Sequence, residues 1–194
     1  MCTVKKPLKT SGLTFVELII SLSIASILIA LGIPAFVRWT QDTAIRSQAE
    51  QLQAAILATR STAVTRNERV KLQFTEANGI ASWRMGCVRV SVNCPEIIES
   101  KIFTENNPIR IGVSTSDNTP ENNVSLSSGS NLPAEISYGA QGAALNQIID
   151  NEITRMDVMH SVNTNAQRLI IKIEMSGEVI ICNPNINKPR SGSC

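Results

Sequence analysis

The sequence predicts an α+β protein in which one long N-terminal helix precedes a β-rich head. Residues 18–37 are uncharged and mostly apolar, and residues 38–67 carry apolar side chains at helical spacing. Charged residues such as Arg60 and Arg66 occupy the other helix faces, where we expect solvent. After residue 70 the pattern changes to short alternating or β-branched runs. We therefore expect a transmembrane and then amphipathic helix that packs on an antiparallel β-sheet.

The run from Leu18 to Val37 is long enough to cross a bilayer. Its 20 residues span about 30 Å as a helix, which is the thickness of the hydrocarbon core. A secretory signal would have a shorter apolar core of about 7–15 residues and a small-residue cleavage site after it. Glu17 does not suit a plain anchor, because a carboxylate in hydrocarbon costs about 2.5–3.5 kcal/mol unless it is paired.

The residues before this run resemble a processing signal. Lys9-Thr10-Ser11-Gly12, followed by Leu13-Thr14-Phe15-Val16-Glu17, is similar to the class III signal of type IV pilins and of type II secretion pseudopilins. The resemblance implies that a prepilin peptidase cuts between Gly12 and Leu13 and methylates the new N-terminus at Leu13. It also implies that the helix remains as membrane anchor and filament core. The family more often has Phe at the first mature position, so Leu13 is a departure.

Glu17 matches the acidic residue that this family carries five places after the cut. The resemblance implies that its carboxylate pairs with the free N-terminal amine of a neighbouring subunit during assembly. Opposite charges in a low-dielectric filament core each remove the other's desolvation penalty, which agrees with that role. Pro34 matches a proline that is common in the family's first helix, and it predicts a helix kink.

The predicted division is a leader at 1–12, a transmembrane helix at 13–37, its amphipathic continuation at 38–67 and a β-rich head at 68–194. This length suits a single globular domain. The leader holds three of the 18 basic residues and no acidic one, so the mature chain has 15 basic against 16 acidic residues, a net charge of −1. Overall charge therefore gives no reason to expect a nucleic-acid partner.

Four cysteines remain after the predicted cut, because the fifth lies in the leader. The basic leader stays in the cytoplasm, so the head is exported to an oxidising compartment where disulfides persist. Sequence alone allows three connectivities, and short loops around turn-forming residues favour Cys87–Cys94 and Cys182–Cys194. A metal site is disfavoured, because the chain has no C-x-x-C and a single histidine.

Six segments after the helix are predicted to be strands. They are 70–74, 80–92, 109–113, 135–138, 168–175 and 178–182. The last two are joined by Ser176-Gly177, a two-residue connection suited to a tight hairpin. The stretch between Ser114 and Pro133 is rich in Ser, Asn and other turn formers and predicts an exposed loop.

Within this superfamily the chain resembles the GspH/FimT branch. The resemblance rests on these segments: 54–67 with Val70-Lys71-Leu72, Trp83 with Gly86, Gly139 with Gly142, and 175–179. It implies a pilin-like fold with a β-sandwich-like head. It also implies a low-abundance minor pilin, or the pseudopilin near the tip of a secretion filament.

The sequence offers no catalytic signature, since G-x-S-x-G, H-E-x-x-H and the P-loop pattern are all missing. We expect no enzymatic activity, cofactor or metal. His160 has no visible nucleophile partner and is predicted to be a surface or loop residue. Asp157 and Glu152 fit a solvated face as well as an acidic patch. We expect Trp83 to pack in the head and Trp39 to lie at the membrane edge.

Two structural functions follow from the resemblance. The first is a minor pilin that initiates or caps a type IV pilus and supports twitching motility, adhesion or DNA uptake. The second is a GspH-like pseudopilin of type II secretion, which would differ in its partners. Expected partners are other minor and major pilins, the prepilin peptidase, the inner-membrane assembly platform and membrane lipid. The expected location is the inner membrane with a periplasmic head, and then the pilus filament at the cell surface.

A third function is DNA binding by a minor pilin in natural transformation. The tail after Cys182 contains Lys188 and Arg190 and no acidic residue, which makes a weak phosphate site. DNA-binding members of the FimT group carry arginines directly after the final hairpin glycine. Gly177 is instead followed by Glu178, so the sequence argues against DNA binding.

Overall fold

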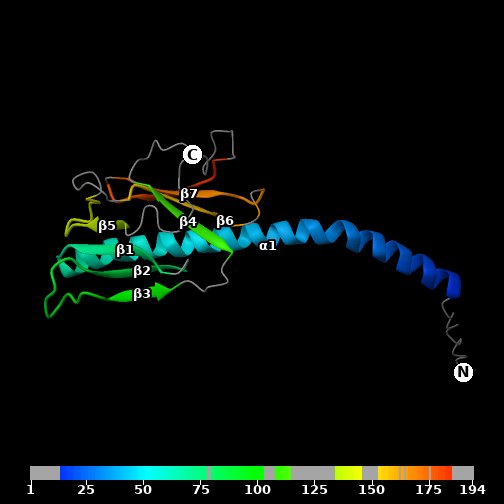
Figure 1. Ribbon diagram of the computed structural model, residues 1–194, viewed down its shortest axis with the longest axis horizontal. Coiled ribbons are helices and arrows are strands. Elements are labelled where there is room, and N and C mark those ends of the chain that lie inside the picture. The colour runs from blue at the N-terminus through cyan, green and yellow to red at the C-terminus, as the bar shows by residue number, and fades with distance from the viewer. Residues whose placement is uncertain are drawn as a thin grey trace, which may run out of the picture. The chain divides into compact units, whose positions relative to one another are not determined.

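The computed structural model describes residues 14–77, 80–102, 108–114, 134–145, 153–161, 163, 165–174 and 176–184. Helix α1 (Phe15–Arg66) runs through two compact units, Met1–Thr40 and Gln41–Cys194. The second unit is the head, and its described strands are shown in Figure 1. These strands are β1 (Val70–Ala77), β2 (Ile80–Cys87), β3 (Glu99–Ile102), β4 (Ile109–Ser114), β5 (Ala134–Tyr138), β6 (Arg155–His160), β7 (Leu169–Ile173) and β8 (Val179–Cys182).

The strands of the head form two antiparallel sheets. The first has the order β3-β2-β1-β5 and the second has the order β4-β6-β7-β8. In the first sheet Phe74 lies opposite Trp83, and in the second Ile171 lies opposite Ile181. This architecture confirms the predicted α+β class with a long apolar helix and an antiparallel β head.

One hydrophobic core joins the head half of α1 to both sheets. Its largest fully buried side chains are Tyr138, Ile45, Leu52, Ile56, Leu72, Ile136, Ile153, Met156, Ile171, Val70 and Val158. Trp83 is also buried, as predicted. Two side-chain hydrogen bonds add to this packing: Gln53 Nε2 donates to the β8 carbonyl of Val179 at 2.9 Å, and Lys101 of β3 donates to Gln51 Oε1. The helix thus contacts an edge strand of each sheet.

The C-terminus of α1 is fixed by a Schellman motif. Asn67 adopts a left-handed conformation with φ of 52°, which Asn tolerates better than most residues. Its N–H donates to Val64 O at 3.2 Å, and the N–H of Glu68 donates to Ala63 O at 3.2 Å. These bonds satisfy carbonyls that would otherwise lack partners, and the chain turns directly into β1.

The outward face of the first sheet is covered by cross-strand polar pairs. Thr75 and Ser82 share a hydrogen bond of 2.8 Å, and the guanidinium of Arg84 donates twice to Gln73 Oε1, at 2.8 and 2.6 Å. Such pairs between directly opposed residues stabilise a sheet and keep one face compatible with water.

Two strands were not predicted. Strand β3 has four exposed side chains and no apolar alternation, so it carries no strand pattern of its own. In β6 the charged residue Asp157 interrupts the apolar pattern of the sequence, although the structure buries its side chain. The predicted strand at 80–92 ends earlier, at Cys87. The predicted loop after Ser114 lies outside the described residues.

The β7–β8 hairpin is present, but the predicted two-residue connection is wrong. The Glu174 N–H donates to Glu178 O at 2.9 Å, and the Gly177 N–H donates to Glu174 O at 2.8 Å. Gly177 has φ of +79°. This left-handed glycine is typical of a longer hairpin loop, in which a turn is followed by a bulge.

Arg60 of α1 holds this hairpin and the turn after β5 together. Its Nε donates to Gly142 O at 2.9 Å, its Nη1 to Gly177 O at 3.2 Å and its Nη2 to Ser176 O at 3.1 Å. The prediction that Arg60 belongs to a solvated face is therefore wrong. One charged side chain satisfies carbonyls from two turns that are distant in sequence.

Gly177 has no room for a side chain, and a Cβ on Gly142 would be tight, at 3.1 Å from Val64 Cγ2. Gly142 and Gly177 both have positive φ, at +76° and +79°. A Cβ on Gly177 would lie 2.4 Å from Gly142 O and 2.9 Å from Arg60 Nε. The contact between the two turns therefore depends on glycine at residue 177.

We predict that Gly177→Ala lowers the free energy of unfolding by about 1–3 kcal/mol, through backbone strain and displacement of Arg60. Gly139→Ala is the matched control, because its Cβ would meet only Leu145 Cδ2, at 3.9 Å. We expect the control to change stability by less than about 0.5 kcal/mol. Denaturant unfolding of the full chain in detergent measures both values, and equal stability of the two variants would contradict the role given to Gly177.

Candidate assembly interface

Helix α1 begins at a capped N-terminus that includes Glu17. Thr14 Oγ1 accepts a hydrogen bond from the Glu17 N–H at 3.2 Å, and Thr14 O accepts from Leu18 at 3.1 Å. Thr14 and Glu17 thus occupy the N-cap and N3 positions of a capping-box sequence. A carboxylate there also interacts favourably with the helix dipole. The T-x-x-E spacing could have revealed this second role of Glu17 from sequence.

The carboxylate of Glu17 is exposed, and no ion pair of Glu17 is found within the part of the chain that the structure describes. The predicted amine partner belongs to another subunit. Pairing of Glu17 with the amine of another subunit stays a prediction.

The first half of α1 presents an uncovered apolar surface. Its most hydrophobic 18-residue window has a mean hydropathy of 2.4, and none of that window is buried. The serine hydroxyls in the segment bond to their own helix: Ser21 to Glu17 O, Ser23 to Ile19 O and Ser26 to Leu22 O, at 2.7 to 2.8 Å. Because these polar groups are satisfied internally, the segment can enter an apolar environment at low cost.

Pro34 lies inside this apolar segment and leaves the carbonyl of Ala30 without its usual helical donor. The kink predicted there stays a prediction. Further along, the rings of Phe36 and Trp39 are 5.9 Å apart, and both side chains are 63% exposed. Placement of Trp39 at the membrane edge also stays a prediction.

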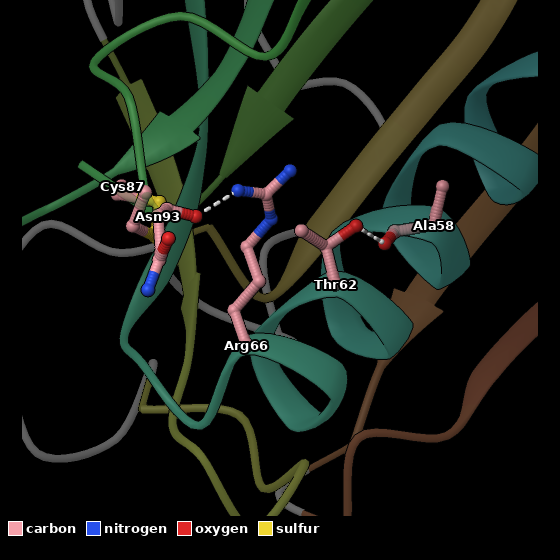
Figure 2. Close-up of a disulfide and its surroundings, with 6 residues drawn as sticks. Ala58, Thr62, Arg66, Cys87 and Asn93 are labelled. Carbon is pink, nitrogen blue, oxygen red and sulfur yellow. Dashed lines mark hydrogen bonds between the residues drawn. A yellow bond between two sulfur atoms is a disulfide. The ribbon is translucent and has the colours of Figure 1, made fainter. Parts of the chain in front are cut away.

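The disulfide predicted between Cys87 and Cys94 is present, with Cα atoms 5.6 Å apart. Figure 2 shows Arg66 reaching from the end of α1 to this loop, where its Nη1 donates to the carbonyl of Asn93. In the same view Thr62 Oγ1 donates to Ala58 O at 2.7 Å. Arg66 is exposed, but it binds the disulfide loop to the helix and is more than a solvated charge.

Cys182 ends β8 and is a disulfide cysteine. Its predicted partner, Cys194, lies outside the described residues, so that pairing stays a prediction. Gly12, Leu13, Lys188 and Arg190 also lie outside them. The predicted cleavage, methylation and DNA-contact residues therefore stay predictions.

Asp157 is the centre of a buried ion cluster, which corrects the prediction of a solvated face. Its side chain is 0% exposed. Arg155 Nη2 lies 3.1 Å from Oδ1, and Arg168 Nη2 lies 3.4 Å from Oδ2. A buried carboxylate needs such partners, since desolvation of an unpaired charge is costly. Glu152, the other residue of the suggested acidic patch, lies outside the described residues.

His160 was predicted to be a surface or loop residue. It is the last residue of β6 and is half-buried, so it lies in a strand and is only partly at the surface. Its Nδ1 accepts a hydrogen bond from the Asn163 N–H at 3.0 Å, and the Asn163 side chain donates to Gln41 Oε1 at 2.6 Å. This chain of contacts ties the β6–β7 connection to α1. Among the described residues, no group of His, Cys, Asp and Glu is arranged to hold a metal ion.

A family profile described as "Type II transport protein GspH" matches residues 48–177. The match covers about two thirds of the 194-residue chain and includes the Arg60 cluster, the strands from β1 to β7 and the hairpin glycine. The chain belongs to the GspH family. No curated protein matches it.

This GspH-family chain is similar to two solved structures. The type IV minor pilin FimU of Pseudomonas aeruginosa PAO1 has a TM-score of 0.50 and 13% identity, over 79% of this chain and 98% of FimU. The minor pseudopilin EpsH of the Vibrio cholerae type 2 secretion system has a TM-score of 0.47 and 7% identity, over 72% of this chain and 97% of EpsH. The FimU likeness supports the pilin-like fold.

We predict that Asp157→Asn lowers the free energy of unfolding by about 3–5 kcal/mol, because it leaves buried arginines without their carboxylate. Glu50→Gln serves as the control, since Glu50 pairs with Arg46 at 3.0 Å on an exposed helix face. Loss of that exposed pair should cost less than about 0.5 kcal/mol. Chemical denaturation of both full-length variants gives the comparison; a small effect at Asp157 would mean that the cluster contributes little to stability.

Proposed function

We propose that this GspH-family chain is a minor pilin that initiates or caps a type IV pilus. The observation that carries the proposal is the uncovered apolar half of α1, which begins at capped Glu17 and continues into a folded head. An apolar helix of this length can pack among other helices in a filament after it leaves the bilayer. The head is anchored to that helix through its shared core, so incorporation of the helix carries the head with it.

The proposed life cycle begins in the inner membrane with the head in the periplasm. A prepilin peptidase removes residues 1–12 and methylates Leu13. Glu17 then pairs with the N-terminal amine of a neighbouring subunit as the helix enters the filament. Removal of the leader matters physically, because it creates the positive charge that compensates the carboxylate.

The alternative is a pseudopilin of a type II secretion system. The matching family is named for type II transport, which favours this alternative. A pseudopilin would use the same anchor, processing and Glu17 pairing but would assemble with different partners. The two functions therefore predict different defects when the protein is missing: loss of surface pili for a minor pilin, and loss of protein secretion for a pseudopilin.

DNA binding receives less support. The residues suggested for it, Lys188 and Arg190, provide two charges, and effective phosphate binding uses more. We therefore keep it as a third alternative.

We expect a strain that lacks this protein to lose surface pili, and complementation to restore them. The measurement is the amount of pilin sheared from the cell surface, compared among parent, deletion and complemented strains. Secretion of proteins across the outer membrane should stay normal. Normal piliation with defective secretion would instead assign the chain to a type II system.

The role of Glu17 can be separated into capping and charge. Glu17→Gln keeps the capping-box residue type but removes the charge, whereas Glu17→Ala removes both. We predict that both variants insert in the membrane, keep an N-methylated Leu13 terminus by mass spectrometry, and enter filaments poorly. Glu50→Ala, on the exposed face of the same helix, should enter normally. Normal incorporation of Glu17→Gln would show that capping, not charge pairing, is the requirement.

A further inference from the structure

Exposed apolar side chains in the head are concentrated in one segment. Among described head residues, four of the eight large exposed apolar side chains lie between residues 88 and 97, which points to a specific surface rather than scattered exposure. Three of them alternate within the disulfide loop: Val88, Val90 and Val92 are 41%, 65% and 102% exposed. We call residues 87–94 the valine loop.

The valine loop is held in one conformation. Besides the disulfide, Ser91 and Cys94 exchange backbone hydrogen bonds of 2.9 and 3.1 Å. Arg66 of α1 donates to the Asn93 carbonyl (Figure 2), and the Val88 N–H donates to Arg69 O at 2.9 Å. The valines are therefore presented on a preorganised backbone, which lowers the entropy that binding would cost.

The base of the loop is fixed by contact with β2. The Cys87 N–H donates to Pro95 O at 3.0 Å, and the Ile98 N–H donates to Met85 O at 2.8 Å. A Cβ on Gly86 would lie 1.6 Å from Glu96 O, so the returning chain crosses directly over that glycine. The close approach of Glu96 explains why residue 86 is a glycine. The same contact gives the valine loop a rigid base.

The charge of the loop favours a protein partner. The valine loop contains a single charged side chain, Arg89, and Glu96 follows two residues after its end. Binding to nucleic acid or to an anionic lipid surface depends on several basic residues. An apolar centre with few charges is instead typical of the buried part of a protein interface.

The size of the loop restricts which protein can be bound. Three valines expose far less than the roughly 800 Å² per partner that a stable complex buries. The loop can therefore act only between chains that other contacts already hold together. In this chain the uncovered apolar half of α1 offers those contacts.

We propose that the valine loop docks into an apolar depression on the head of a neighbouring subunit of the same filament. The contact joins two different surfaces and is therefore heterologous, like the contacts between subunits of a helical filament. This inference rests on the proposed function, since it requires helices assembled side by side. The loop then adds specificity for the neighbour to the general affinity of the helices.

The test replaces Val90 and Val92 by aspartate in the full-length chain. Because a charge in an apolar contact is strongly unfavourable, we expect incorporation into filaments to fall about tenfold or more. Membrane insertion should be unchanged, and the melting temperature should stay within about 2 °C, since both side chains are exposed. Ile102→Asp, at a 77% exposed residue of β3 outside the loop, is the control and should be incorporated normally.

A photoreactive amino acid at residue 92 identifies the occupant. In cells that assemble filaments we expect a covalent adduct with another subunit that has a pilin-type N-terminus, identified by mass spectrometry. The same probe at exposed Arg84, on the polar face of the first sheet, should give no such adduct. Normal incorporation of the aspartate variant, or adducts at residue 92 only with lipid or nucleic acid, would overturn the docking proposal alone. Absence of the wild-type chain from every filament would overturn the proposed function as well.

Discussion

Burial of one face of α1 is the constraint on which the head depends. From Ile45 to Ala63 the helix contributes to the same core as strands from both sheets, and its side chains reach edge strands β3 and β8. An amphipathic helix and a sheet each have an apolar face that needs a covering layer. The helix supplies that layer, so the head half of α1 and the strands stabilise one another and fold as one unit.

The N-terminal half of α1 is also apolar, but it packs on no other part of the described chain. Its large apolar side chains are exposed, and its serines are satisfied by their own backbone. The sequence predicted the long helix with its apolar first part, because helical periodicity and an uncharged run are local patterns. It also predicted the Cys87–Cys94 disulfide and the final hairpin, since turn-forming residues lie within each short loop.

Features that depend on distant residues were missed. The carbonyl partners of Arg60 lie 82 and 117 residues away, so nothing near Arg60 distinguishes it from a solvated charge. Strand β6 was missed for the same reason: Asp157 breaks the apolar pattern, and the arginine at residue 168 that helps to neutralise it comes from a different segment. Strand β3 has no pattern, and its pairing with β2 positions it.

The two roles of Glu17 have different energetic weights. A carboxylate near a helix N-terminus gains about 0.3–1 kcal/mol from the dipole at an exposed site. Placing an acidic side chain in hydrocarbon costs about 2.5–3.5 kcal/mol on insertion scales. The capped helix end therefore offsets only part of that cost, and the remainder requires a cation. Among the described residues of this chain no cation pairs with Glu17. The proposed amine of a neighbouring subunit would supply the missing charge, so the energetic deficit itself favours assembly with another chain.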